Sequence, residues 1–419
     1  MNVIKVCGPS HAEGIADVQG SKNAALPMMA AAVITGEKTV LENCPDISDI
    51  RVTADILRTL GCSVSFENNT LTVDSSGEVT NYIPMHLTCK LRSSFLLCGA
   101  LLARCKNVSL AYPGGCRIGC RPVDIHLNAF EKLGAKITKT DEGVSLAMDK
   151  FTPCDVYFPF PSVGATENVM IYAAAMPGTV RIIGAACEPE IADLQKMLNS
   201  AGGNVSGAGT PVVTIRGTKA FSGTRCSVMP DRIAAATLMT LPAMTGGEII
   251  LRKACARHVS PYIAFLRKHG VSVCSCSDGL AVSAKKRLNA DAVIQTAPYP
   301  GFATDMQSLC MAVSSLGKGV CVIKENVFEN RFLMSGALTA MGADIKVRGR
   351  CASIRGVRSL NCANVSASDL RSGAALIAAM SAAHGESSLS GIEYIDRGYE
   401  NIVRDFSALG VDIERIEKN

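Results

Sequence analysis

One loop of this chain, from Pro113 to Asp124, combines residue types that could carry out chemistry. Its glycines and prolines disfavour both a helix and a strand, so we expect an irregular segment here. Cys116 lies in this loop and is followed by Arg117 and Arg121. Nearby guanidinium groups favour the thiolate form of a cysteine and attract anions. The pattern therefore predicts a loop that closes over an anionic substrate and places a thiol beside it.

A purely structural role is the alternative for every thiol, because the chain contains 18 cysteines and cysteine is often a small buried hydrophobe. For Cys116 the loop setting makes a catalytic role as well supported as a packing role. Cys120 shares the loop but is interpreted as an ordinary cysteine. The sequence has no C-x-x-C pair, and Cys274 and Cys276 lack a nearby histidine partner, so no zinc or other metal site is predicted.

Several apolar helices are predicted to begin beside a basic side chain, namely Lys22, Arg232 or Arg371. The amino-terminal end of a helix dipole disfavours a cation by a few tenths of a kcal/mol, up to about 1 kcal/mol. The recurrence of this arrangement indicates an anion between the dipole and the cation. For each residue alone, solvation or pairing with a carboxylate is the alternative, and Arg232 could pair with its neighbour Asp231.

Two other helix starts have different candidates. Residues 161–166 offer backbone N–H groups for a phosphate or a carbonyl oxygen, although a simple capped helix start fits equally well. Asp305 puts a carboxylate in a first helical turn, where stabilisation by the dipole is the alternative. Residues 20–23 do not follow the order of a P-loop, and no G-x-G-x-x-G opens a helix after a strand. No nicotinamide cofactor is therefore predicted.

The elements that position these residues recur along the chain. Six times, a predicted helix ends at a glycine that is followed by a strand, and glycine after the last helical residue is a common stop signal. These glycines are Gly61, Gly134, Gly202, Gly270, Gly342 and Gly410. The spacing predicts six α/β units of about 70 residues each. Six such units favour two domains of three units.

Composition agrees with two domains, since each half of the 419 residues can bury its own core. The formal charge of +5 is mild, and no basic run indicates nucleic acid. No apolar run is long enough to span a membrane, and the first residues lack the apolar stretch of a signal peptide. Many cysteines without a pattern favour a reducing cytoplasm. The oligomeric state is not predicted.

Nine short motifs occur in order along the chain, at residues 20–27, 113–116, 119–124, 162–166, 230–232, 304–306, 328–331, 369–371 and 396–399. Each is weak alone, but the ordered set is specific. It resembles the UDP-N-acetylglucosamine 1-carboxyvinyltransferase family, the enolpyruvyl transferases of peptidoglycan synthesis. The resemblance runs from about Val6 to Arg415, nearly the whole chain.

This resemblance implies a two-domain inside-out α/β barrel fold, with three repeated units per domain and helices inside the sheets. The first domain would span residues 22–229 and contain the cysteine loop. The second would combine residues 1–21 with residues 230–419, because the amino-terminal strand joins it in the family. The predicted apolar, alanine-rich helices suit a position buried on all sides.

The resemblance also implies a reaction: enolpyruvyl passes from phosphoenolpyruvate to the 3-hydroxyl of UDP-N-acetylglucosamine, and phosphate is released. Addition followed by elimination needs a proton donor and a base. By matching position, Cys116 would be the general acid and Asp305 would take the hydroxyl proton. Phosphoenolpyruvate could also trap Cys116 covalently. No metal or organic cofactor is implied, and both partners are small molecules.

Binding residues follow from the same resemblance. The phosphate of phosphoenolpyruvate would be held by Lys22, Arg121 and Arg397, and its carboxylate end by Arg331 and Arg371. Asn23 would contact phosphate or sugar, and Arg92 the nucleotide side. The UDP-sugar site would be lined by Arg121, Pro122, Val123, Asp124, Ile125, Phe160, Pro161, Ser162, Val163, Gly164, Asp305 and Val327.

The chain departs from the family pattern at a few positions that bear on substrate affinity. Ser48 and Phe160 stand where members carry lysine, and further departures are Tyr112, Cys120 and Ala337. Two rival functions remain. The shikimate-pathway enolpyruvyl transferase shares the fold and the donor but lacks the cysteine loop. A UDP-sugar-binding paralogue without turnover would keep the site but not the reaction.

Overall fold

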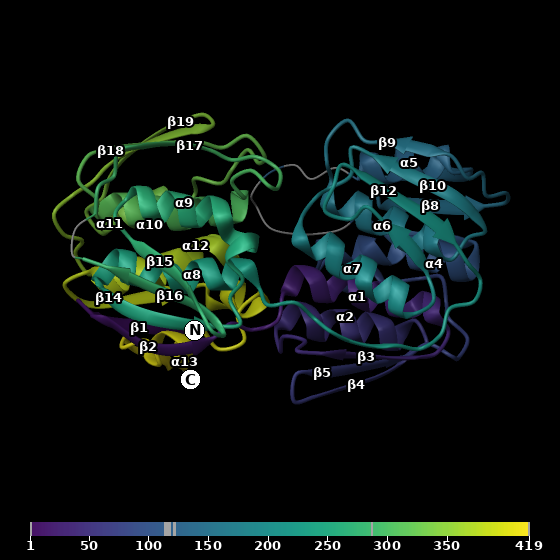
Figure 1. Cartoon of the computed structure of the whole chain (residues 1–419), viewed down its shortest axis with the longest axis horizontal. Helices are drawn as coiled ribbons and strands as arrows, with labels where there is room; N and C mark the ends of the chain where they lie inside the picture. Colours follow the sequence, from purple (N-terminus) through teal and green to yellow (C-terminus); the bar gives the residue numbers. More distant parts are fainter. Residues whose placement is uncertain (1, 113–118, 120–122, 286–287, 418–419) are drawn as a thin grey trace. The chain divides into compact units, whose positions relative to one another are not determined.

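The computed structural model describes residues 2–112, 119, 123–285 and 288–417 (Figure 1). Five residues singled out in the sequence, namely Cys116, Arg117, Cys120, Arg121 and Pro122, lie outside these ranges. The described chain divides into two compact units. Unit 1 contains the residues before Gly20, Gly119, and those from Pro230 onward, and unit 2 contains Gly20 to Tyr112 and Val123 to Met229. Among the described residues, no helix is long and apolar enough to cross a membrane.

Unit 2 repeats one order of elements three times: a central helix, a strand, an outer helix and two antiparallel strands. The central helices are α1 (Lys22–Thr35), α4 (Leu97–Cys105) and α6 (Val163–Ala174), and the outer helices are α2 (Ser48–Thr59), α5 (Asp124–Lys132) and α7 (Pro189–Ser200). The short turns α3 (Met85–Thr88) and η1 (Arg92–Leu96) precede α4. The strands are β3 (Lys38–Glu42), β4 (Ser63–Glu67), β5 (Thr70–Asp74), β6 (Asn107–Ala111), β7 (Ala135–Lys139), β8 (Gly143–Met148), β9 (Asp155–Tyr157), β10 (Gly178–Ile183), β11 (Asn204–Ser206), β12 (Val212–Gly217) and β13 (Arg225–Ser227).

Unit 1 follows the same order, except that in its third repeat the second of the two antiparallel strands comes from the amino-terminal end of the chain. Its central helices are α8 (Arg232–Thr245), α10 (Gln307–Leu316) and α12 (Leu370–Ala382), and its outer helices are α9 (Ser260–Lys268), α11 (Ser335–Ala340) and α13 (Ile402–Ser407). Three short 3-10 turns are η2 (Ala256–Val259), η3 (Thr304–Met306) and η4 (Ile392–Arg397). The strands are β1 (Val3–Gly8), β2 (Ala12–Asp17), β14 (Gly247–Arg252), β15 (Ser272–Cys276), β16 (Gly279–Ala284), β17 (Ala292–Gln295), β18 (Val320–Lys324), β19 (Asp344–Arg348), β20 (Cys351–Arg355), β21 (Asn364–Ser366), β22 (Gly385–Ser390) and β23 (Asp412–Ile416).

The described strands form six separate sheets, one per repeat. Five have four strands, in the orders β13-β3-β5-β4, β11-β12-β10-β9, β15-β16-β14-β2, β17-β18-β20-β19 and β21-β22-β1-β23. The sixth, β6-β8-β7, has three strands, and an isolated parallel bridge between Tyr82 and Ser109 takes the place of the fourth. The amino-terminal strand β1 lies between β22 and β23 and pairs with both in antiparallel register. The mixed α/β class is thus confirmed, although no described sheet closes on itself as a barrel would.

The central helices are buried on nearly all sides. Every residue of α8 is buried, and α1 is buried from Ala24 to Thr35. Within each unit the three central helices contact one another. Their alanines permit this close approach because a methyl side chain adds little bulk. Polar atoms at the helix ends are therefore the parts of these helices that can serve chemistry.

The six glycines that the repeat singled out end the outer helices in a left-handed conformation. Their φ angles lie between +85° and +106°. An L side chain is strained in this region and glycine is not. The sequence prediction of a glycine stop in every repeat is confirmed, and it explains why each outer helix turns at once into a strand.

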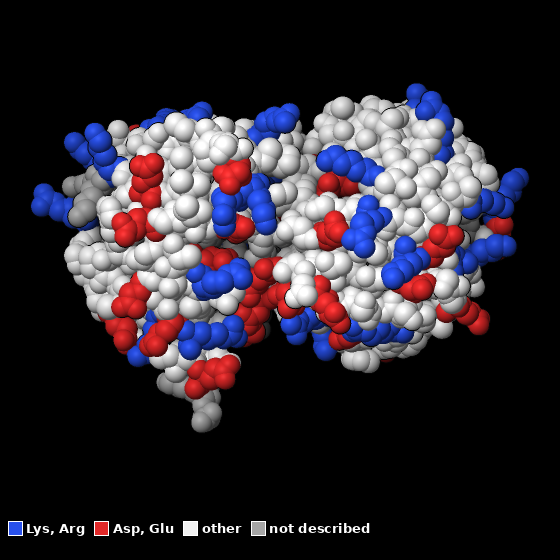
Figure 2. All heavy atoms as spheres, turned by 60° about the horizontal axis from the view of Figure 1, so that its bottom comes forward, with Lys and Arg blue, Asp and Glu red and all other residues white. Residues whose placement is uncertain are grey.

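Charged side chains lie scattered among uncharged ones on the surface in Figure 2. Figure 2 shows acidic and basic residues interspersed on the face that it presents. Exposed pairs such as Arg415 with Asp396, 2.8 Å apart, are common. Pairs of this kind contribute about 0–1 kcal/mol each, because water screens them. The buried helices, rather than the surface ion pairs, must supply most of the stability.

Two of the six glycines allow a test of this account within unit 1. A Cβ at Gly270 would meet no atom within 4 Å, so Gly270→Ala should cost only the conformational strain, roughly 1–2 kcal/mol. A Cβ at Gly410 would lie 2.7 Å from the carbonyl oxygen of His11, so Gly410→Ala should cost clearly more. Urea unfolding gives both free energies. Equal losses would contradict the steric argument.

Candidate active site

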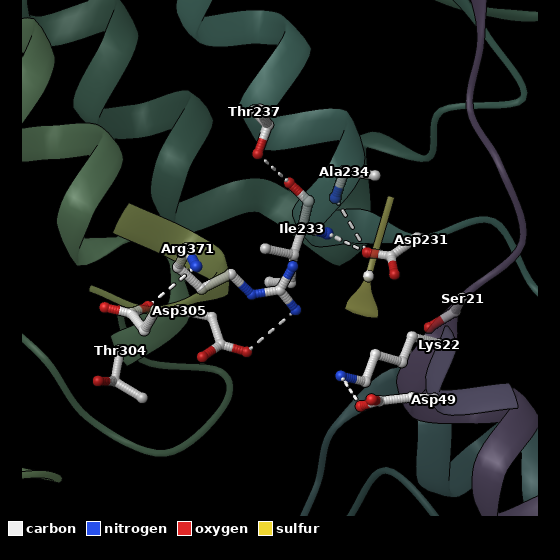
Figure 3. A network of polar contacts seen from close by, with 12 residues as sticks. Ser21, Lys22, Asp49, Asp231, Ile233, Ala234, Thr237, Thr304, Asp305 and Arg371 are labelled. Carbon is white, nitrogen blue, oxygen red and sulfur yellow. Dashed lines mark hydrogen bonds and ion pairs between the residues drawn. The ribbon is translucent and has the colours of Figure 1, made fainter. Parts of the chain in front are cut away.

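Asp305 contacts two buried guanidinium groups in unit 1, and Figure 3 shows it beside that of Arg371. It lies in the short turn η3, directly before α10. Nη2 of Arg331 donates to Oδ1 of Asp305, and Nη2 of Arg371 lies 3.5 Å from Oδ2. The side chain of Asp305 is 27% exposed, whereas those of Arg331 and Arg371 are 3% and 6% exposed. The structure thus brings three predicted site residues together and leaves the carboxylate as the most accessible of the three.

The two buried guanidinium groups share the carboxylate of Asp305, and Arg331 has a second carboxylate partner. Nη1 of Arg331 also lies 3.5 Å from Oδ1 of Asp369. Asp369 caps α12 by accepting from the N–H groups of Arg371 and Ser372, at 2.9 and 3.2 Å. Burial works to lower the pKa of Arg371, but Asp305 and other neighbouring groups raise it overall, so this guanidinium stays charged. Such sharing is required because an unpaired buried charge is strongly destabilising.

Arg397 ends the turn η4, and its following residues are tightly held. Nε2 of the buried Gln19 donates to the carbonyl oxygen of Gly398 at 3.0 Å, and Oε1 of Gln19 accepts from the N–H of Glu400 at 3.0 Å. The hydroxyls of Tyr399 and Thr237 are 2.7 Å apart. These bonds fix the backbone that carries Arg397.

In unit 2, Lys22 begins α1 and contacts a carboxylate. Its Nζ pairs with Oδ2 of Asp49, the second residue of α2 (Figure 3). Both side chains are nearly buried, and Asn23 follows on the same helix. This cation at a helix start therefore has a carboxylate partner, the alternative that the sequence left open. Asp49 was missed, because an acidic residue in a first helical turn is common and gives no distinguishing signal.

The comparable cation of α8 is placed differently. Asp231 caps this helix and accepts from the N–H groups of Ile233 and Ala234 at 2.8 and 3.0 Å. The guanidinium of Arg232 lies over the ring of Tyr299, 5.7 Å from its centroid, which is a cation–π distance. The cations at these helix starts thus differ in their neighbours: Lys22 has its own carboxylate, Arg232 an aromatic ring, and Arg371 a carboxylate that it shares with Arg331.

The start of α6 is capped by Ser162, whose Oγ accepts from the N–H of Ala165 at 3.4 Å. Phe160 is exposed just before it, while Pro161, Ser162, Val163 and Gly164 are half-buried. His126 of α5 lies against this start: a Cβ at Gly164 would be 3.1 Å from Cε1 of His126. A side chain at position 164 would therefore press on that imidazole. Ser162 thus caps this helix start.

His126 links several predicted binding elements of unit 2. Its Nδ1 lies 2.9 Å from Nδ2 of Asn168. Burial, and then the charge of Arg92, lower the pKa of His126 to about 3, so the ring is neutral at physiological pH. Because the amide donates to Nδ1, the proton is on Nε2. Arg92, the first residues of α5 and the start of α6 therefore lie close together. Sequence reasoning missed His126, since a lone histidine in a helix is usually a core residue.

The remaining predicted residues divide as follows. Val123 is buried directly before α5, and Asp124 and Ile125 open that helix. Val327 follows β18, close to Phe328 and Arg331 in sequence. Cys116, Arg121 and Pro122 lie outside the described residues. Among the described residues, no group of three or more His, Cys, Asp and Glu side chains could hold a metal ion.

Comparison with known proteins identifies the family. Residues 6–406 match the family model described as EPSP synthase (3-phosphoshikimate 1-carboxyvinyltransferase). Proteins named UDP-N-acetylglucosamine 1-carboxyvinyltransferase are similar over the full length: one from Finegoldia magna is 42% identical, with 100% of this chain and 99% of that protein covered. The chain belongs to this family of enolpyruvyl transferases.

Further relatives agree. One from Caldanaerobacter subterraneus subsp. tengcongensis, whose name carries the number 2, is 40% identical and covers 99% of this chain and 100% of that protein. Solved structures match the fold. They include the enolpyruvyl transferase NikO from Streptomyces tendae, with a TM-score of 0.89 and 22% identity over 100% and 99% of the chains. EPSP synthase from Acinetobacter baumannii has a TM-score of 0.76 and 17% identity, with both chains fully covered.

A buried carboxyl group in α6, that of Glu167, should make the stability of the protein depend on pH. Glu167 is almost completely buried, and its Oε1 has no hydrogen-bond partner among the described residues. Burial, followed by the charges of Glu190 and Glu188, raises the pKa of Glu167 well above its usual range. The folded protein thus holds this group protonated at a pH where the unfolded chain ionises it, so stability is lost as the pH rises above about 4.5.

Glu167→Gln should remove this loss, because an amide does not ionise. The variant should match the parent near pH 4 and become more stable above it, by up to about 1.4 kcal/mol per pH unit until the folded pKa is reached. Thermal and urea unfolding across pH 4–9 would measure the difference. Glu131→Gln, at an exposed position on α5 of the same unit, is the matched control and should show no such trend. A pH-independent difference for Glu167→Gln would contradict the argument.

Proposed function

We propose that this protein transfers the enolpyruvyl group of phosphoenolpyruvate to the 3-hydroxyl of UDP-N-acetylglucosamine and releases phosphate. The observation that supports this best is the 40–42% identity, over 99–100% of the chain, to relatives that bear that enzyme's name. The reaction would be the first committed step of peptidoglycan synthesis. It would thereby serve cell-wall formation, cell shape and cell division. A cytoplasmic location is part of the proposal, supported by the many unpatterned cysteines.

The charged group of unit 1 supports a role in binding phosphoenolpyruvate and accepting a proton. Arg331 and Arg371 would hold the carboxylate end of phosphoenolpyruvate. Nη1 of Arg371 is buried and has no hydrogen-bond acceptor among the described residues, which suits a donor for an anionic ligand. Asp305, the accessible carboxylate, would take the proton of the sugar hydroxyl. Arg397 would hold the phosphate.

In unit 2, Lys22 would bind the same phosphate and Asn23 would contact phosphate or sugar. The nucleotide side would use Arg92, the start of α5 and the capped start of α6, whose dipole favours a phosphate. Cys116 would protonate the methylene carbon of phosphoenolpyruvate, with Arg121 on its phosphate and Pro122 beside the UDP-sugar. We also propose the inside-out barrel arrangement for each unit, which the three fully packed central helices support.

Phosphate release tests the proposed function. Purified protein mixed with phosphoenolpyruvate and UDP-N-acetylglucosamine should release phosphate and form the enolpyruvyl ether of the sugar nucleotide, detected by mass. Replacing the acceptor with shikimate 3-phosphate, the substrate of the rival family branch, should give no product. Turnover of shikimate 3-phosphate would overturn the proposal. Binding of UDP-N-acetylglucosamine without any turnover would favour the non-catalytic paralogue.

Variants of Cys116 test the proton donor. A thiol with an ordinary pKa near 8.5 is protonated at neutral pH yet acidic enough to donate. Cys116→Ser should lose nearly all turnover, because a serine hydroxyl is a far weaker acid, whereas Cys116→Asp should retain part of it. A fosfomycin-type epoxide should label Cys116, as peptide mass mapping can show. Full activity of Cys116→Ser, or labelling at Cys120 instead, would reject this assignment.

Variants of Lys22 and Arg397 test the phosphoenolpyruvate site. A hydrogen bond to a charged group is worth about 1.5–3 kcal/mol, so Lys22→Ala or Arg397→Ala should weaken phosphoenolpyruvate binding about ten-fold or more. Calorimetry with UDP-N-acetylglucosamine alone should change little. Lys22→Ala also removes a partner of Asp49, and the double variant Lys22→Ala with Asp49→Asn controls for that loss. Equal loss of both ligands would show that these residues support the fold instead.

A further inference from the structure

Glu325 is a completely buried carboxylate that the mechanism above does not use. It directly follows β18, and its two oxygens accept four hydrogen bonds. Oε1 accepts from Oγ1 of Thr296 at 2.8 Å and from the N–H groups of Val327 and Phe328 at 2.8 and 3.1 Å. Oε2 accepts from Oγ1 of Thr304 at 3.0 Å. The four donors are two hydroxyl and two backbone N–H groups, all of them neutral. Glu325 therefore holds its neighbours in place through hydrogen bonds.

The two oxygens hold two different parts of the candidate site. Oε1 holds the backbone at Val327, which is proposed to line the UDP-sugar site. Oε2 holds Thr304, which directly precedes the proposed base Asp305 in the turn η3. A single buried side chain thus connects a segment that would contact the acceptor with the residue that would remove its proton.

The hydroxyl of Thr304 extends this connection to Arg331. Because it donates its proton to Glu325, its oxygen is free to accept from Nε of Arg331, at 3.3 Å. Arg331 in turn donates to Asp305 through Nη2. The direction of these bonds depends on a carboxylate at position 325. An amide nitrogen facing Thr304 would donate to the hydroxyl and compete with Arg331 for the same oxygen.

We propose that Glu325 is a positioning residue for the transfer reaction: it aligns Asp305 and Arg331, through Thr304, with the UDP-sugar segment at Val327. The inference rests on the proposed function. Glu325 has no exposed surface, so it would act on the reaction only through these neighbours. A displacement of the base by about 1 Å can reduce turnover about 100-fold.

Three variants test this alignment. Glu325→Gln keeps the shape but reverses one hydrogen bond, and Thr304→Val keeps the shape but removes the hydroxyl. Each should lower kcat for phosphate release 10- to 100-fold and change the acid limb of its pH profile, where the base titrates. Thr304→Ser keeps the hydroxyl and should retain most of kcat. The double variant Glu325→Gln with Thr304→Val should be little worse than the worse single variant, because both act through one contact.

A merely structural role makes different predictions. Thr240→Val serves as the control, since Thr240 is a buried threonine of α8 whose hydroxyl lies 2.6 Å from that of Tyr262. It should lower the melting temperature but leave kcat per folded protein and the pH profile unchanged. If the Glu325 and Thr304 variants behave like this control, or if Thr304→Ser is as impaired as Thr304→Val, the inference is wrong. Should Glu325→Gln fail to fold, the two Thr304 variants decide alone.

An assay of the unmodified protein distinguishes a failure of the proposed function from a failure of the positioning role alone. If it releases no phosphate from phosphoenolpyruvate and UDP-N-acetylglucosamine, the proposed function fails, and the positioning role fails with it. If it turns over and both Glu325→Gln and Thr304→Val turn over at the same rate and with the same pH profile, only the positioning role is overturned.

Discussion

One constraint shapes the candidate site of this protein: each charge that the apolar interior removes from water needs a partner. The central helices are buried almost entirely, so charged side chains at their first turns are buried too. An uncompensated charge in such a place would be strongly destabilising. The structure meets this demand with Lys22 and Asp49 in one unit, and with Arg331 and Arg371 around Asp305 and Asp369 in the other.

This constraint also ties binding to folding. A guanidinium that already shares a carboxylate is held in a fixed orientation, which reduces the entropy lost when an anion binds. The same pairing limits the sequence, because removing one partner leaves the other buried and alone. Asp305 differs from its partners in keeping part of its surface open to solvent. This exposure supports the proposal that Asp305 takes the proton of the sugar hydroxyl.

Buried hydrogen bonds from neutral donors hold the elements that carry the charged group. Gln19 fixes the backbone around Arg397, and Glu325 fixes both Thr304 and the segment at Val327. In unit 2, the pair of Asn168 and His126 does comparable work behind the start of α6. These supports come from elements far apart in the sequence. Polar groups buried with all their partners in place give a rigid arrangement, whereas partly satisfied ones would not.

The sequence by itself determined the repeat and the family. Glycine is the residue that adopts a left-handed conformation without strain, so the six helix stops could be read directly and all six have that conformation. Ordered motifs likewise sufficed for the enolpyruvyl transferase family. The roles given to Cys116 and the other site residues remain proposals.

Only the tertiary structure decided which partner each helix-start cation takes. It also showed that Asp305 contacts both Arg331 and Arg371, and it brought in His126, Asp49 and Glu325. Local patterns fix backbone conformation because φ and ψ depend on neighbouring atoms. Ion pairs and buried hydrogen bonds depend on distances between residues that only the packing of the repeats brings together.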